Sequence, residues 1–246
     1  MTVLVIAEQV DGVFRKVTFE AITAARTLDS EVHALVLGNG IEAAAAELGA
    51  YGAAKILVAE DGALNDYTVD AYTNVAADVI GQINPAAVIV GATTQGKELA
   101  ARLSARLDAP MASDCTAVNM EGDQVVAIRP MYGGKILAEV ALVGTPAVVS
   151  LRPNTVTAKE ASSDSTVEKV TANVGDVRIQ VKSKQLESGK IDLTEAEIVV
   201  SGGRGMGGDD FSAIEALAKV LGAAVGASRS AVLSYSEGTS TSADHR

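Results

Sequence analysis

The stretch of this sequence best suited to chemistry is residues 201–208, which contain five glycines together with Arg204. Glycines let a ligand approach the backbone closely, and arginine adds a planar, charged fork that suits phosphate. The stretch follows an expected strand at 197–200 and precedes an expected helix at 211–221, where backbone amides converge on an anion. We therefore interpret it as an anion-binding loop. The alternative is a flexible loop in solvent.

A second candidate, residues 226–230, follows an expected strand at 223–227. Open α/β sheets bind ligands beyond the carboxyl ends of their strands. Ser228 is suited to donate to a phosphate or a ribose, and Arg229 to place positive charge beside a reducible ring. The alternative is an ordinary helix-capping serine next to a solvated arginine.

Residues 91–97 have the spacing of a phosphate-binding loop, with two glycines separated by four residues and then a lysine. The loop follows a strand and opens a helix. However, Glu98 stands where a Walker loop needs the Ser or Thr hydroxyl that binds Mg²⁺. The sequence favours a tight strand-to-helix turn over an NTPase site, and weak nucleotide binding at the helix N-terminus stays open.

Other conspicuous side chains have ordinary structural explanations. Residues 128–135 indicate a hairpin with a Gly-Gly turn, and Tyr132 at its tip is a candidate interface residue. Cys115 is most simply a small buried side chain. His33, inside an expected strand, is more often a satisfied core histidine than a catalyst.

The elements that must position these residues alternate between strand and helix. Short apolar runs predict strands at 2–7, 31–37, 55–59 and 87–90. Helical spacing of apolar residues predicts helices at 17–28, 41–48, 66–83 and 97–107. This alternation predicts an α/β fold with a parallel sheet covered by helices on both faces.

After Pro110 the pattern changes. The sequence predicts an antiparallel meander of strands at 124–129, 135–143 and 147–152. A further strand is expected at 177–182. Residues 183–190 are polar and contain a glycine, so they are the best linker candidate. A new unit begins at Ile191.

Composition narrows the functional classes. The chain has 246 residues, a formal net charge of −11, 48% hydrophobic residues, one cysteine and two histidines. The hydrophobic content supports a packed core, and one cysteine excludes a disulfide scaffold. Two distant histidines leave little for a metal site, so we expect no metal. The acidic balance argues against nucleic-acid binding, because few cations are available to neutralise phosphates.

No apolar run in the sequence approaches ~20 residues, so we expect no membrane-embedded segment. The first residues lack the basic region of a secretory signal. We therefore expect a cytoplasmic protein.

Taken together, these motifs resemble the α subunit of electron transfer flavoproteins. The most specific likeness is the pair formed by residues 200–205 and 225–229. The matching stretches follow the family order and are residues 1–8, 91–107, 129–134, 146–153, 198–205 and 223–232.

The resemblance implies an adenine-nucleotide-hydrolase-like N-terminal domain and a Rossmann-like C-terminal domain that holds FAD. It implies an electron carrier rather than an enzyme, paired with a β subunit. The flavin would take electrons from dehydrogenases, such as acyl-CoA dehydrogenases in fatty acid β-oxidation, and pass them to a membrane quinone reductase. The related β subunit binds AMP, whereas the α subunit has lost that site, which agrees with Glu98.

Site residues follow from the same resemblance. Gly203, Arg204, Gly205 and Ser228 match positions that bind FAD. Arg229 matches the arginine beside the isoalloxazine, where positive charge stabilises the anionic reduced flavin.

The resemblance divides the chain into an α/β domain at 1–190 and the start of the FAD-binding domain at 191–232. The family pattern continues with Gly-Gln-Thr-Gly and Ser-Gly-Ala-x-Gln-His segments that this sequence lacks. We therefore expect an incomplete FAD domain, truncated after about Val232, and a disordered or out-of-family tail at 233–246. Two alternatives stay open: an FAD-deficient scaffold subunit, and a nucleotide-binding module without redox activity.

Overall fold

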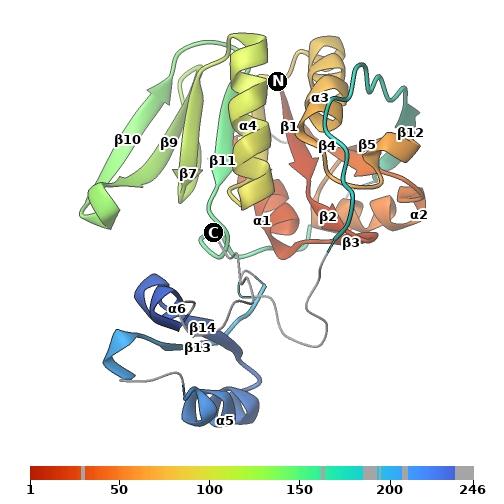
Figure 1. Ribbon diagram of the computed structural model, residues 1–246. Helices are drawn as coiled ribbons and strands as arrows, with labels where there is room; N and C mark the ends of the chain where they lie inside the picture. The colour runs from red at the N-terminus through yellow and green to blue at the C-terminus, as the bar shows by residue number, and fades with distance from the viewer. Residues whose placement is uncertain (29–30, 162–163, 185–192, 194, 207–209, 236–246) are drawn as a thin grey trace. The chain divides into compact units, whose positions relative to one another are not determined.

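The computed structural model describes residues 1–28, 31–161, 164–184, 193, 195–206 and 210–235. The chain forms two compact units, Met1–Ser183 and Lys184–Arg246 (Figure 1). None of the helices in these described ranges combines the length and the apolar character needed to cross a membrane.

The first unit is built on a seven-stranded, wholly parallel sheet with the strand order β12-β5-β4-β1-β6-β11-β7. Its strands are β1 (Thr2–Ala7), β4 (Glu31–Gly38), β5 (Lys55–Glu60), β6 (Ala87–Gly91), β7 (Met111–Cys115), β11 (Ala147–Leu151) and β12 (Thr166–Val170). From β1 the chain builds outward through β4 and β5, then crosses back to β6. The switch point of the sheet therefore lies between β1 and β6, and the predicted parallel sheet is confirmed.

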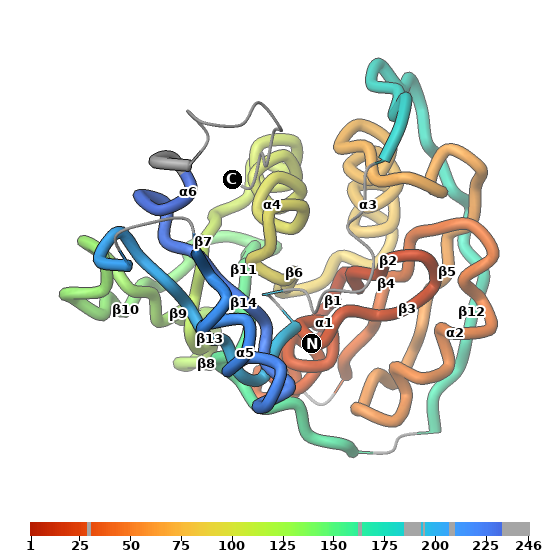
Figure 2. The backbone as a smooth tube through the Cα atoms, turned by 60° about the horizontal axis from the view of Figure 1, so that its bottom comes forward, coloured from red at the N-terminus to blue at the C-terminus, as the bar shows by residue number. Residues whose placement is uncertain are grey.

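Helices cover both faces of this sheet, as expected. Figure 2 shows α3 (Val69–Ile83) and α4 (Thr94–Leu107) along one face, with α1 (Lys16–Ala25) on the other. The alternation of β1 explains the two layers. Val3 and Val5 belong to the buried cluster on the α1 side, and the intervening Leu4 belongs to the cluster on the α3 and α4 side.

Short elements complete the first unit. They are a small hairpin of β2 (Gln9–Val10) and β3 (Val13–Phe14), the helix α2 (Glu42–Ala45), and the 3-10 helices η1 (Ala46–Tyr51) and η2 (Gly62–Leu64). The helix predicted at 41–48 is thus one α turn followed by a 3-10 segment. It ends at Gly52, whose φ of +103° only glycine adopts readily.

The expected antiparallel extension is present as β10-β9-β8. It consists of β8 (Ala117–Glu121), β9 (Gln124–Met131) and β10 (Ile136–Leu142), with the 3-10 turn η3 (Tyr132–Gly134) at the hairpin tip. The prediction that residues 147–152 belong to this meander is wrong. β11 lies in the parallel sheet between β6 and β7, and all five of its residues are buried. Burial on both faces is typical of a central parallel strand.

The prediction of a strand at 177–182 is also wrong, because these residues have no regular secondary structure and are almost all exposed. Instead β12, unpredicted, pairs with β5 at the sheet edge. Charged side chains flank it: Lys55 Nζ lies 2.6 Å from Glu168, and Lys169 Nζ lies 2.7 Å from Glu42. Charges along an edge strand discourage pairing with other chains.

The second unit contains a parallel pair of strands, β13 (Val199–Gly202) and β14 (Ala224–Ala227), connected through α5 (Ser212–Leu221). The 3-10 turn η4 (Arg204–Met206) follows β13, and α6 (Arg229–Tyr235) follows β14. This strand-helix-strand arrangement agrees with the expected start of a Rossmann-like domain. The predicted tail begins within α6, and its residues 236–246 lie outside the described residues, as do residues 185–190 of the expected linker.

Candidate functional site

The two loops singled out in the second unit begin at the same edge of its sheet. β13 and β14 run parallel with Gly202 opposite Ala227. The backbone N–H of Ser228 donates to the carbonyl oxygen of Gly202 at 2.9 Å. A Cβ built on Gly203 would lie 3.5 Å from Ser228 Oγ. The glycine loop and Ser228 are therefore neighbours, although 25 residues separate them in sequence.

Ser228 has the capping role of the alternative interpretation. Its Oγ accepts a hydrogen bond from the N–H of Ala231 at 3.3 Å, and its carbonyl oxygen accepts from Val232 at 3.1 Å. A hydroxyl that accepts a hydrogen bond still has its own proton to donate. Capping α6 and donating to a ligand are therefore compatible.

The glycines of the loop serve different purposes. A Cβ on Gly202 would approach Phe211 Cε1 to 2.7 Å and Ile214 Cδ1 to 2.9 Å, so this glycine lets α5 pack against the end of β13. A Cβ on Gly205 would meet nothing within 4 Å among the described residues. Packing among the described residues therefore does not require a glycine at position 205. The glycine instead leaves the backbone open to close approach by a ligand.

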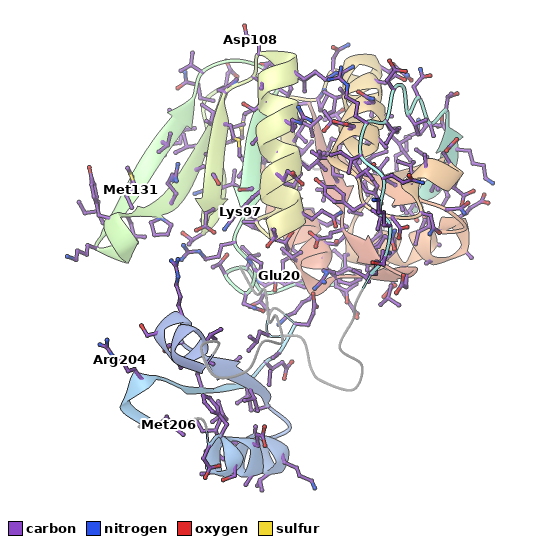
Figure 3. All side chains as sticks on the ribbon, in the orientation of Figure 1. Glu20, Lys97, Asp108, Met131, Arg204 and Met206 are labelled. Atoms are coloured by element: carbon purple, nitrogen blue, oxygen red, sulfur yellow. The ribbon has the colours of Figure 1, made fainter. Side chains whose placement is uncertain are left out.

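Two arginines lie at this edge, and both are exposed. Arg204 belongs to η4 after β13 (Figure 3), and Arg229 begins α6 after β14. Within the described ranges neither guanidinium has an ion-pair partner. The acidic Asp210 is engaged instead at the start of α5, where the Ser212 N–H donates to it at 2.9 Å. Hydrogen bonds from Ser212, first from its side chain and then from its backbone, lower the pKa of Asp210. The edge can therefore receive an anionic ligand.

The phosphate-loop-like residues 91–97 form the turn between β6 and α4. Thr93 Oγ1 caps the helix by accepting from the Gly96 N–H at 3.0 Å, which explains why α4 begins three residues earlier than predicted. A Cβ on Gly96 would collide with the carbonyl oxygen of Gly91. A Cβ on Gly91 would come within 2.7 Å of Val17. These glycines serve tight packing of the turn.

A residue that the sequence interpretation missed, Glu8, lies beside this turn. It follows β1 and is 8% exposed, and its Oε2 accepts a hydrogen bond from Thr93 Oγ1 at 2.6 Å. Its Oε1 is 3.4 Å from Arg15 Nε. One signal was available: a carboxylate directly after an apolar strand marks the ligand-binding end of a parallel sheet.

A charged cluster at the ends of β7 and β11 was also missed. Arg152 makes a bidentate contact with Asp114, at 3.2 Å and 2.6 Å, and Lys97 Nζ is 3.5 Å from the same carboxylate. Asp114 has a φ of +60°, and its N–H donates to the buried Ser150 Oγ at 2.9 Å. The Arg152 guanidinium, chiefly, holds the pKa of Asp114 below its ordinary value.

The remaining residues singled out lie apart from these sites. Cys115 is buried, and burial raises the pKa of its thiol to about 11, which disfavours a reactive thiolate. His33 Nε2 lies 3.3 Å from Glu31 on the same strand. Tyr132 lies in the turn η3 at the tip of the β9–β10 hairpin and is 73% exposed. Its neighbour in sequence, Met131, is labelled at this tip in Figure 3.

Comparison with known proteins decides the family. A family model described as "Electron transfer flavoprotein domain" matches residues 3–175, and one described as "Electron transfer flavoprotein FAD-binding domain" matches residues 192–242. The chain belongs to the electron transfer flavoprotein α-subunit family. The second match reaches past Val232 into the expected tail.

Relatives of this family member carry several names. The electron transfer flavoprotein subunit alpha of Bacillus subtilis is 43% identical over 236 residues, covering 93% of this chain and 72% of the relative. The protein FixB of Clostridium saccharobutylicum is 36% identical, covering 94% and 72%. A lactate dehydrogenase (NAD(+),ferredoxin) subunit, LctC, of Acetobacterium woodii is 32% identical, covering 92% and 57%.

FAD is the cofactor of this member of the electron transfer flavoprotein α-subunit family. Such α subunits are electron carriers rather than enzymes, and they pair with a β subunit. The edge formed by β13 and β14 fits the cofactor, because open loop backbone and two unpaired guanidiniums among the described residues suit the diphosphate of a dinucleotide. FAD, when bound, supplies a ring that accepts and releases electrons.

Proposed function

We propose that this chain is the FAD-carrying α subunit of a heterodimeric electron transfer flavoprotein in the cytoplasm. It takes electrons from acyl-CoA dehydrogenases and other dehydrogenases, as in fatty acid β-oxidation, and delivers them to a membrane quinone reductase. The observation that carries the proposal is the meeting of the Arg204 loop and Ser228 at one sheet edge, in a region matched by an FAD-binding family model. The LctC relative is named as a subunit of a lactate dehydrogenase, which supports a donor other than acyl-CoA dehydrogenases.

Each site residue has a role in this proposal. Gly203 and Gly205 allow the loop backbone to approach the cofactor closely. Arg204 pairs with its diphosphate, and the Ser228 hydroxyl donates to a phosphate or ribose oxygen. Arg229 stands beside the isoalloxazine and stabilises the negative charge of the reduced ring. The FAD-binding part begins near residue 191, after a domain that comprises residues 1–190.

The β subunit, in this proposal, covers the tip of the β9–β10 hairpin. Four apolar side chains there are exposed: Met131 at 38%, Tyr132 at 73%, Ile136 at 53% and Leu137 at 66%. Met131 and Ile136 are paired directly across β9 and β10, so they lie on one face of the hairpin, and exposed apolar side chains grouped in this way mark protein interfaces. Aromatic residues such as tyrosine often provide much of the binding energy.

The test is to co-express the chain with a β subunit, add FAD, and record the visible spectrum of the purified heterodimer. We expect a flavin spectrum that bleaches when a reduced donor dehydrogenase is supplied. A heterodimer that stays colourless would refute the electron-carrier role and favour the scaffold alternative. Tyr132→Ala should weaken heterodimer formation without lowering the melting temperature of the isolated chain, because its side chain is exposed.

A further inference from the structure

The switch point of the first unit's sheet is the place where a parallel α/β sheet ordinarily binds its ligand. It lies between β1 and β6, and two residues close to the ends of these strands meet there. Glu8 directly follows β1, and Thr93, the N-cap of α4, stands two residues after the end of β6. The start of a long helix favours a negative charge at this point.

Hydrogen bonds hold Glu8 firmly at this switch point. Its N–H donates to Thr18 Oγ1 at 2.9 Å, and its carbonyl oxygen accepts from Thr18 Oγ1 and from the Arg15 N–H, both at 3.0 Å. Its carboxylate is 2.6 Å from Thr93 Oγ1, the same oxygen that accepts from the Gly96 N–H. The carboxylate thus connects through Thr93 to the helix terminus.

A nucleotide phosphate would compete for this position. The residue is 8% exposed, so water screens its charge weakly, and a second anion beside it would be repelled. Glu98 adds another carboxylate nearby. Burial, then the charges of Glu98 and Glu8, raise the pKa of Tyr67, whose hydroxyl donates to the carbonyl oxygen of Gln95 at 3.3 Å. Two carboxylates, Glu8 and Glu98, therefore act on the start of α4, and Arg15 Nε lies 3.4 Å from the Glu8 Oε1 that faces away from Thr93.

We propose that Glu8 is the resident anion at this switch point, and that its carboxylate excludes nucleotide phosphates from the first unit. Glu8 then determines specificity by exclusion: it supplies from within the chain the negative charge that a phosphate would otherwise bring. The proposal concerns the first unit alone and is independent of FAD binding by the second.

The direct test compares the full-length chain with its Glu8→Ala variant by isothermal titration with AMP and, separately, with adenosine. The wild-type chain should give no saturable heat with AMP, and Glu8→Ala should bind AMP at least about tenfold more tightly. Adenosine, which lacks the phosphate, should not distinguish the two. Glu31→Ala, which removes an exposed carboxylate at the opposite end of the neighbouring strand, is the charge-matched control and should behave like wild type.

Two results would overturn the proposal: a folded Glu8→Ala chain that binds AMP no better than wild type, or an equal gain in Glu31→Ala. If Glu8→Ala fails to fold, Glu8→Gln keeps the shape and still accepts from Thr93. The measurement is then the melting temperature in inorganic phosphate against chloride at matched ionic strength. We expect phosphate to raise the melting temperature of Glu8→Gln by a few degrees more than that of wild type. An identical response of both proteins contradicts the proposal.

Discussion

The carboxyl edges of the two sheets look alike in sequence but differ in what they offer a ligand. Each has a glycine-containing loop between a parallel strand and a helix. In the first unit the loop is closed on itself and a buried carboxylate, Glu8, contacts its helix cap. In the second unit the loop keeps an open Gly205, and Arg204 has no ion-pair partner among the described residues. A glycine-rich loop therefore indicates a site only when the side chains facing it leave room and suitable charge.

The largest expected effect tests the closed loop. Gly96→Ala would drive a Cβ into the carbonyl oxygen of Gly91, so the turn between β6 and α4 must shift. We expect a loss of about 3 kcal/mol in the free energy of unfolding, measured by urea denaturation followed by circular dichroism. Gly81→Ala in α3, where a Cβ has open space, should instead stabilise by about 0.5 kcal/mol. A neutral Gly96→Ala would mean that the first loop is as open as the second.

The next effect tests the open loop. Arg204→Ala should weaken FAD binding to the heterodimer about tenfold, because one charge-assisted contact to the diphosphate is lost. Titration of the apoprotein with FAD, followed by quenching of flavin fluorescence, measures the change. Arg178→Ala removes an exposed arginine from the first unit and should leave FAD affinity unchanged. Equal losses in both variants would show that only the overall charge matters.

A smaller effect concerns the cluster at the ends of β7 and β11. Asp114→Asn introduces asparagine, which also tolerates the left-handed backbone found at this position. The substitution removes the ion pair with Arg152, and we expect the free energy of unfolding to fall by about 1 kcal/mol near neutral pH. Folding lowers the pKa of Asp114 below its ordinary value of 3.8. The carboxylate therefore contributes its full stabilisation of the folded state at pH values above 3.8, and this contribution disappears as the pH falls through the folded-state pKa. Urea midpoints of the two proteins should therefore differ at pH 7 and converge in acid.

Asp108→Asn is the matched control for this prediction. Asp108 is also an aspartate with a left-handed backbone, at the opposite end of α4 from Lys97 (Figure 3), but it is exposed. Its substitution should change the unfolding free energy by less than about 0.5 kcal/mol. A pH-independent difference for Asp114→Asn would contradict the assignment of its stabilisation to the carboxylate.

The smallest expected effect on stability comes from Gly205 and compares the open loop of the second unit directly with the closed loop of the first. Gly205→Ala makes the same change as Gly96→Ala, but its Cβ meets nothing within 4 Å among the described residues. We expect the unfolding free energy to change by less than about 0.5 kcal/mol, and FAD affinity to fall because the added methyl group hinders close approach to the backbone. Unchanged FAD affinity would show that the cofactor does not approach this residue.

The sequence by itself determined the fold class and most of its elements. Apolar runs flanked by turn residues specify buried strands locally, and the strand predicted at 2–7 matches β1 at both ends. Local turn chemistry likewise located the glycine loop and the residues after β14. These features depend on neighbours a few residues away, which periodicity and turn signals report directly.

Only the tertiary structure decided which distant segments meet. β11 is recognisable as a strand, but its place between β6 and β7 comes from hydrogen bonds to residues about 40 to 60 positions away in sequence. Thr93 and Glu8 lie 85 positions apart, yet their hydrogen bond connects the ends of β1 and β6 at the first unit's switch point. Such contacts leave no periodic signal, because a side chain's partner across a sheet is set by strand order and register rather than by its own neighbours.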